Sequence, residues 1–176
     1  MGKGANFERD TCRQLSLWWT EGGRDDVFWR TAGSGARATS RGKAGRSTYG
    51  QYGDIQAVDP IGAPLLRMFT FELKKGYMGN TISDAFDSII RKADRVHPFV
   101  EFLQQAYKSS VAAGSASWAL IHRRDNRHTT ITLPFGIFPD VIRRLDHVTV
   151  TFTWGLLFRI IGCNFTVCQV RLEELL

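Results

Sequence analysis

The segments Gly53-Asp54-Ile55 and Phe69-Thr70-Phe71-Glu72-Leu73-Lys74 carry the strongest signals in this 176-residue sequence. The second segment ends a β-rich run over residues 66–74, which we interpret as a strand. Successive side chains of a strand point to opposite faces, so an acid and a lysine two residues apart project together. The residues predicted to share that face are Met68, Thr70, Glu72 and Lys74.

The acid Asp54 belongs to an earlier strand, predicted over residues 52–58. Residues 59–64, Asp-Pro-Ile-Gly-Ala-Pro, are rich in turn-forming types and join the two predicted strands. Two strands connected by such a turn lie side by side. The sequence therefore predicts that the carboxylates of Asp54 and Glu72 converge at the end of this pair of strands.

Two converging carboxylates form a hard-oxygen site of the kind that Mg²⁺ prefers. A metal there lowers the pKa of a bound water and stabilises negative charge on a phosphate undergoing attack. Lys74 can hydrogen-bond the attacking water or offset that charge. The alternative is that Glu72 and Lys74 lie by chance on a solvated strand face. The preceding Phe69-Thr-Phe favours a central strand, where a solvated face is less expected.

This arrangement resembles the PD-(D/E)xK, or restriction-endonuclease-like, nucleases, in which an acid is followed on the next strand by an E-x-K triplet. Within that superfamily, Gly4-Ala-Asn-Phe-Glu8-Arg9, the turn Ala32-Gly-Ser34-Gly-Ala and the two segments above look most like archaeal-type Holliday junction resolvases and their viral relatives. The resemblance covers residues 3–77. The sequence departs from the pattern in having Gly53 where the motif has proline, in the long step from Asp54 to Glu72, and in a longer basic loop.

The resemblance implies an α/β fold with a mixed central β-sheet flanked by helices. It also implies a homodimer that cuts branched DNA with Mg²⁺, for which Mn²⁺ would substitute. Lys74 would be the catalytic base or orient the water, and Ser34 matches a small polar residue near the site. The implied metal ligands are Glu8, Asp54, Glu72 and the backbone carbonyl of Leu73.

Glu8 also has a structural interpretation, because an acid near the start of a helix is stabilised by the helix dipole whether or not it binds metal. A helix is predicted over residues 5–20, with Asn6 as its N-cap and with Cys12, Leu15 and Trp19 on one face. Extending that face one turn backwards leads to Glu8. A short strand is predicted over residues 27–31.

Residues 32–50 consist mainly of small and polar types, with five glycines and almost no large apolar side chain. We expect a mobile loop, since such a segment buries too little apolar surface to offset the entropy of ordering. Residues 30–50 contain five basic residues and no acid, which favours contact with DNA phosphates over a solvated linker. The predicted DNA-binding residues are Arg30, Arg37, Arg41, Lys43, Arg46 and Lys75, the last of which has a solvated surface position as its alternative.

The remaining pattern predicts a long amphipathic helix from Ile82, split at Pro98 and ended at Gly114, followed mainly by strands. No internal repeat or linker divides the sequence, so we expect one nuclease domain over residues 1–176 with extra C-terminal strands. Predicted strands cover residues 117–121, 129–133, 148–154, 157–161 and 165–172, and a short helix covers residues 138–145.

Composition excludes several classes of protein. With 43% hydrophobic and 23% charged residues the chain is globular, and its net charge of +6 is compatible with a polyanionic partner. No apolar run reaches the roughly 20 residues of a membrane span, and the absence of a signal sequence predicts the cytoplasm of a bacterial, archaeal or virus-infected host cell. The three cysteines are interpreted as buried thiols.

The histidines and tryptophans have no motif of their own. His122 and His128 flank a predicted hairpin turn, and we expect surface positions or phosphate contacts for them, not a metal pair. Trp18, Trp19 and Trp29 have the right chemistry to stack on bases, although aromatic residues at such spacing are usually core.

The function predicted from the sequence is therefore a metal-dependent endodeoxyribonuclease that resembles Holliday junction resolvases and acts in DNA recombination and repair. The alternatives within the superfamily are a nicking, flap or restriction nuclease, because one fold supports several activities. A non-catalytic nucleic-acid-binding protein on the same fold is a further alternative. Against that last interpretation, a pure binder gains from losing carboxylates that repel DNA.

Overall fold

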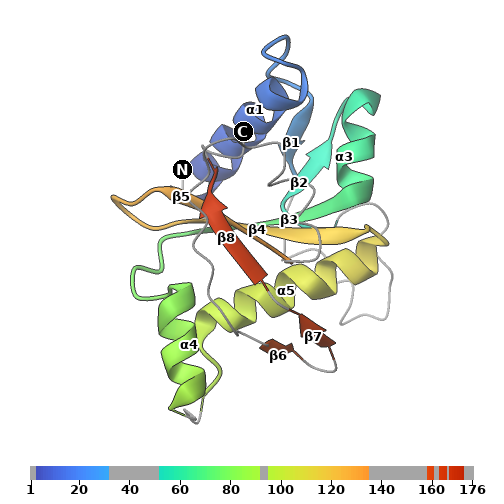
Figure 1. Cartoon of the computed structure of the whole chain (residues 1–176). Coiled ribbons are helices and arrows are strands. Elements are labelled where there is room, and N and C mark those ends of the chain that lie inside the picture. Colours follow the sequence, from blue (N-terminus) through green and yellow to red (C-terminus); the bar gives the residue numbers. More distant parts are fainter. Residues whose placement is uncertain are drawn as a thin grey trace, which may run out of the picture. The chain divides into compact units, whose positions relative to one another are not determined.

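The computed structural model describes residues 3–31, 52–91, 95–134, 158–160, 163–165 and 167–172 (Figure 1). Two compact units divide the chain. The first contains residues 1–73, 106–118 and 176, and the second contains residues 74–105 and 119–175. The sequence-based expectation of one nuclease domain stays a prediction.

The first unit begins with the helix α1 (Lys3–Trp19), whose apolar face packs against the strand β1 (Phe28–Arg30). Cys12 and Leu15 are buried, as the helical pattern predicts, and Phe28 is fully buried. The Ser16 hydroxyl joins the two elements, because it donates to the Cys12 carbonyl and accepts from the Phe28 amide at 2.9 Å. The predicted N-cap Asn6 lies inside the helix, which begins three residues earlier.

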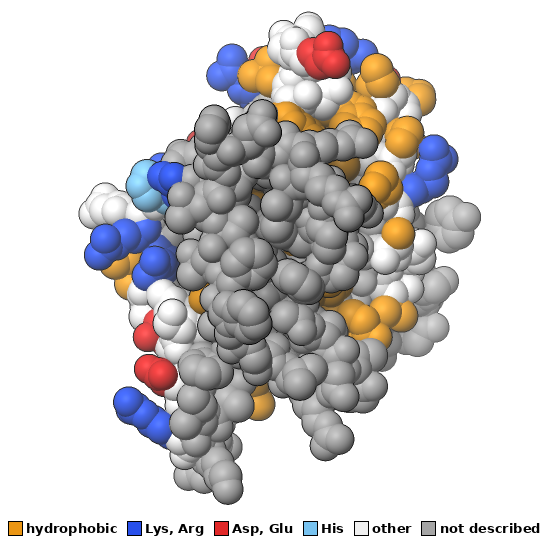
Figure 2. All heavy atoms as spheres, viewed as in Figure 1, with side chains coloured by type: hydrophobic (Ala, Val, Ile, Leu, Met, Phe, Trp, Pro, Cys, Tyr) orange, Lys and Arg blue, Asp and Glu red, His pale blue; other side chains and the backbone are white. Residues whose placement is uncertain are grey.

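The strand β1 pairs with β2 (Ile55–Ala57) in an antiparallel ladder that sets Trp29 opposite Gln56. Both strands are shorter than their predicted ranges. Burial alternates along β1: Phe28 is fully buried whereas Trp29 is 48% exposed. Trp18 is 39% exposed, so the expectation that these aromatic residues are core is wrong for Trp18 and Trp29. Figure 2 shows apolar side chains at the surface over this part of the molecule.

Residues 60–68 form two helices where the sequence predicts a turn followed by the start of a strand. A 3-10 helix, η1 (Pro60–Gly62), is followed directly by α3 (Ala63–Met68). The Asp59 carboxylate caps η1 by accepting from the Ile61 amide at 3.0 Å, and each helix has a proline in its first turn, where a missing N–H costs nothing. The predicted strand therefore begins at Phe69, and Met68 does not share its face.

A mixed sheet is built in the order β3-β4-β5-β8. Just before β3 and β4 begin, the Ala116 amide donates to the Arg67 carbonyl. Where the two strands end, the Gly76 amide donates to the Arg123 carbonyl. Their starts and their ends are therefore adjacent, so β3 and β4 run parallel. β4 with β5, and β5 with β8, are antiparallel. The mixed α/β fold is thereby confirmed. The four strands are β3 (Phe69–Lys75), β4 (Ser117–Arg123), β5 (Thr129–Pro134) and β8 (Val167–Arg171).

The long predicted helix is divided as expected into α4 (Ile82–Ile90) and α5 (Pro98–Ala113). Gly114 follows α5 with a φ of +68°, the left-handed conformation that ends many helices and that glycine adopts without strain. The sequence signals for a break at Pro98 and a stop at Gly114 are both confirmed.

The end of the chain differs from its prediction. The range predicted as one strand, residues 165–172, holds parts of two strands with different partners. β7 (Cys163–Phe165) pairs with β6 (Phe158–Ile160), whereas β8 pairs with β5. The predictions for residues 32–50, 138–145 and 148–154 lie outside the described residues.

His122 is buried on β4, which corrects its expected surface position. Its side chain is 3% exposed, and its ring lies 6.0 Å from that of Phe99 and 6.1 Å from that of Phe102. Burial lowers the pKa of His122; a hydrogen bond to the Gly76 carbonyl opposes the shift and the charge of Arg124 adds to it. His122 is therefore neutral in the folded chain at pH 7.

We predict that this histidine makes folding less favourable in acid. The unfolded chain takes up the proton with the ordinary pKa of 6.5, above the folded value, so stability is present above pH 6.5 and is lost as pH falls below it. Urea unfolding between pH 8 and pH 5 should show this loss in the wild type and a smaller loss in His122→Gln. If the free energies of unfolding of the wild type and of His122→Gln differ by the same amount at every pH in that range, the prediction is contradicted.

Candidate active site

The strand β3 is covered on both faces where it carries the acid of the Glu-x-Lys triplet. Thr70, Phe71, Glu72 and Leu73 are all buried, and Glu72 is only 2% exposed. A carboxylate this deep cannot remain charged without nearby charge or hydrogen-bond compensation. The interpretation of the triplet as a solvated strand face is therefore excluded for Glu72.

Asp54 is fixed against β3 by hydrogen bonds of its side chain and its backbone. Its carboxylate Oδ2 accepts from the Leu73 amide at 2.8 Å, and its own amide donates to the Phe71 carbonyl at 2.8 Å. Its carbonyl accepts from the Thr31 amide at 2.9 Å. These contacts hold Asp54 beside Leu73, the residue that follows Glu72. The predicted pairing of the two strands is wrong, because β2 pairs with β1 in one sheet and β3 pairs with β4 in another.

Gly53 explains why the motif's proline is absent from this chain. Its φ is +73°, whereas the proline ring holds φ near −65°. The backbone is also tightly packed, because a Cβ on Gly53 would lie 2.6 Å from the Phe71 carbonyl oxygen and 2.8 Å from Cγ2 of Thr70. The turn that aims Asp54 at β3 therefore requires glycine.

We predict that Gly53→Ala lowers the free energy of unfolding by about 1–3 kcal/mol and displaces Asp54. The reason is the combined strain of a positive φ and a clash with backbone of β3. Gly79→Ala is the matched control, because a Cβ there meets nothing within 4 Å. Denaturant unfolding checks the prediction, and equal stability of the two variants contradicts it.

α1 brings Glu8 into the same region as Asp54. Glu8 forms an ion pair with Arg30, with 3.0 Å between Oε2 and Nε. One helical turn later, burial raises the pKa of Cys12 to about 12, and the negative charges of Glu8 and Asp54 add to the shift while Arg30 opposes it. Both carboxylates thus act on one thiol, which stays protonated. Cys12 is buried, as the sequence predicts.

Lys74 follows on β3, and its surroundings lie in the second unit. Its ammonium Nζ donates to the side-chain carbonyl of Gln105 at 3.0 Å and lies 5.4 Å from the centre of the Phe102 ring. Both partners come from α5. Lys75 is half-buried. Gln105 was not identified from the sequence, since nothing in a glutamine within a helix points to a lysine 31 positions away.

The donor set fits a hard cation. Asp54, Glu72 and the Leu73 carbonyl offer oxygen ligands, and Mg²⁺ usually takes only one or two protein carboxylates. No group of three or more His, Cys, Asp or Glu residues that could hold a metal occurs among the described residues. Next to Asp54, the buried hydroxyl of Thr31 has no hydrogen-bond partner in the described part of the chain, which is typical where a water or ligand completes a site. The remaining predicted site residues lie outside the described residues; they are Ser34, Arg37, Arg41, Lys43 and Arg46.

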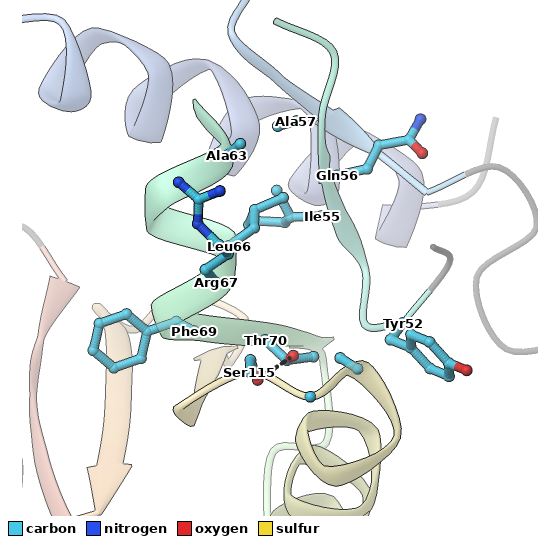
Figure 3. Close-up of a pocket in the computed structure, with 12 residues that line it drawn as sticks. Tyr52, Ile55, Gln56, Ala57, Ala63, Leu66, Arg67, Phe69, Thr70 and Ser115 are labelled. Carbon is cyan, nitrogen blue, oxygen red and sulfur yellow. Dashed lines mark hydrogen bonds between the residues drawn. The ribbon is translucent and has the colours of Figure 1, made fainter. Parts of the chain in front are cut away.

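A pocket of about 320 Å³ lies in the first unit (Figure 3). α3 and β2 stand on its two sides, and the Thr70 and Ser115 hydroxyls, 2.8 Å apart, lie at its base. Neither Asp54 nor Glu72 lines it. The sequence could not reveal this pocket, because its wall comes from a helix that was predicted as turn and strand.

The comparison with family models matches residues 1–155 to a family described as "Phage putative PDDEXK endonuclease". The chain belongs to this family. The match supports the PD-(D/E)xK superfamily of nucleases for this chain. Searches of curated proteins and of solved structures found no match. Among the described residues, no helix has the length and apolar character to cross a membrane.

Proposed function

We propose that this chain is a Mg²⁺-dependent endonuclease that cuts branched DNA in the manner of a Holliday junction resolvase. The observation that carries the proposal is the hydrogen bond from the Leu73 amide to the Asp54 carboxylate, which joins the first acid of the motif to the Glu-Leu-Lys triplet. The family match supports nuclease chemistry over the other activities of a metal-binding site.

Each group of the motif has a defined task in this proposal. Asp54, Glu72 and the Leu73 carbonyl would hold the metal, and Glu8 would contribute if its ion pair with Arg30 opened. Mg²⁺, when bound, acidifies a water and neutralises charge on the phosphate. Lys74 orients the attacking water through its ammonium, and Gln105 restricts where that ammonium can point.

The substrate assignment rests on charge and on the resemblance to resolvases. The segment between β1 and β2 contributes Arg37, Arg41, Lys43 and Arg46 without an acid, so it favours phosphate contact. A nicking, flap or restriction nuclease uses the same chemistry and remains the alternative within the superfamily. A non-catalytic binder has no use for a carboxylate buried as deeply as Glu72.

We predict that Asp54→Ala, Glu72→Ala and Lys74→Ala each reduce cleavage strongly, by about 10²–10⁴-fold for the lysine. DNA binding should persist, because affinity comes mainly from basic contacts to phosphate. Lys108→Ala, an exposed lysine of α5, is the control. Cleavage of labelled DNA with Mg²⁺, with Mn²⁺ and with EDTA measures the effect. Near-normal cleavage by Glu72→Ala would remove the assigned site.

We also predict that the chain is a homodimer that nicks a four-way junction symmetrically, because a two-fold junction needs two related cuts. Purified protein incubated with four-way, flap, nicked and linear duplex DNA tests the substrate, and light scattering tests the dimer. Paired nicks confined to the junction support the resolvase. A monomer that cuts only flaps or duplex DNA instead identifies another type of nuclease.

A further inference from the structure

Trp29 is a large apolar side chain left at the surface beside the proposed catalytic acid. It is 48% exposed, whereas its neighbour Phe28 on the same strand is fully buried. Of the two neighbouring aromatic residues of β1, the larger, Trp29, is therefore on the outer face and the smaller, Phe28, is in the core. An exposed indole that packing does not explain is a common feature of binding surfaces.

Gln56 lies directly opposite Trp29 in the ladder between β1 and β2, so the two side chains share one face of this pair of strands. In Figure 3 the Gln56 side chain points away from α3. The face thus offers a flat aromatic ring together with an amide that can both donate and accept hydrogen bonds. That combination suits a nucleobase, which has a π face and a polar edge.

The position of this pair relates it to the chemistry. Trp29 lies about 7 Å along the chain from Thr31, which is two residues further on. The Thr31 amide hydrogen-bonds the Asp54 carbonyl, so Trp29 is near the residue that carries the acid. Stacked nucleotides follow one another at about 3.4 Å, so a base on Trp29 belongs within about two nucleotides of a phosphate held at Asp54. The next residue, Arg30, is the first of the five basic residues between positions 30 and 50.

We propose that Trp29 stacks on an unpaired nucleobase of the DNA strand being cut, and that Gln56 hydrogen-bonds the edge of that base. The inference rests on the proposed nuclease function and adds a contact that recognises unpaired DNA. A paired base has its faces covered by its neighbours and its Watson–Crick edge occupied, so this contact favours branched or single-stranded regions over intact duplex.

The test measures binding of fluorescent oligonucleotides in EDTA, which separates recognition from cleavage. Single-stranded DNA with an abasic nucleotide moved along the strand is compared with the intact strand, for wild type, Trp29→Ala and Trp29→Phe. We expect Trp29→Ala to weaken binding of the intact strand by about five- to 150-fold, with Trp29→Phe retaining most of the affinity. At one position, the abasic nucleotide should weaken DNA binding by the wild type and leave the affinity of Trp29→Ala unchanged. Gln56→Ala should show a smaller loss.

Trp18→Ala is the matched control, since Trp18 is also exposed but lies on α1. If the wild type binds DNA and Trp29→Ala binds it equally well, this inference is overturned and the nuclease proposal stands. A wild-type chain that binds none of the oligonucleotides overturns both. If Trp29→Ala instead dissociates a dimer in light scattering without changing affinity for DNA, the face is a contact between copies of the chain and not a base-binding surface.

Discussion

The hydrogen bond between the Leu73 amide and the Asp54 carboxylate is the contact on which the arrangement of this site depends. At this point of β3 a side chain occupies the position that a backbone carbonyl of a neighbouring strand would normally take. A charged acceptor makes a stronger hydrogen bond than a neutral one, so the strand edge gains stability while the acid gains a fixed position. Gly53 makes this possible, because only a residue that tolerates φ of +73° lets the chain turn so closely over β3.

That arrangement places carboxyl groups inside the protein. Asp54 and Glu72 are both almost fully buried, and α1 holds Glu8 in the region of Asp54, where both act on Cys12. Arg30 supplies one balancing charge through its ion pair with Glu8. Buried carboxylates in one region destabilise a fold unless a cation or hydrogen bonds compensate them. Their retention in the core therefore favours a chemical role, because a chain selected only for stability would place apolar side chains there.

The sequence predicted the features that follow from local periodicity. Alternation identified β3, a 3.6-residue repeat identified α1, and Pro98 with Gly114 correctly bounded α5. The helix α3 was missed because proline and glycine were interpreted as a turn, whereas two prolines in first-turn positions and the Asp59 cap start helices equally well. The burial of His122 was also missed, because it results from the rings of Phe99 and Phe102, which belong to α5 and pack against His122 on β4. The hydrogen bond of Lys74 to Gln105 was missed for the same reason, because the two residues are 31 positions apart.

The place of the basic segment in the fold follows from the same ladder. Residues 32–51 lie between Thr31 and Tyr52, and the hydrogen bond from the Thr31 amide to the Asp54 carbonyl joins the chain on both sides of them. The entropic cost of closing such a connection rises only slowly with its length, by about 0.6 kcal/mol for each doubling. A connection of this length therefore costs the fold little, whether or not it contacts DNA as proposed. Because the Thr31 amide hydrogen-bonds the Asp54 carbonyl, the segment that is proposed to contact DNA begins and ends beside the proposed catalytic acid.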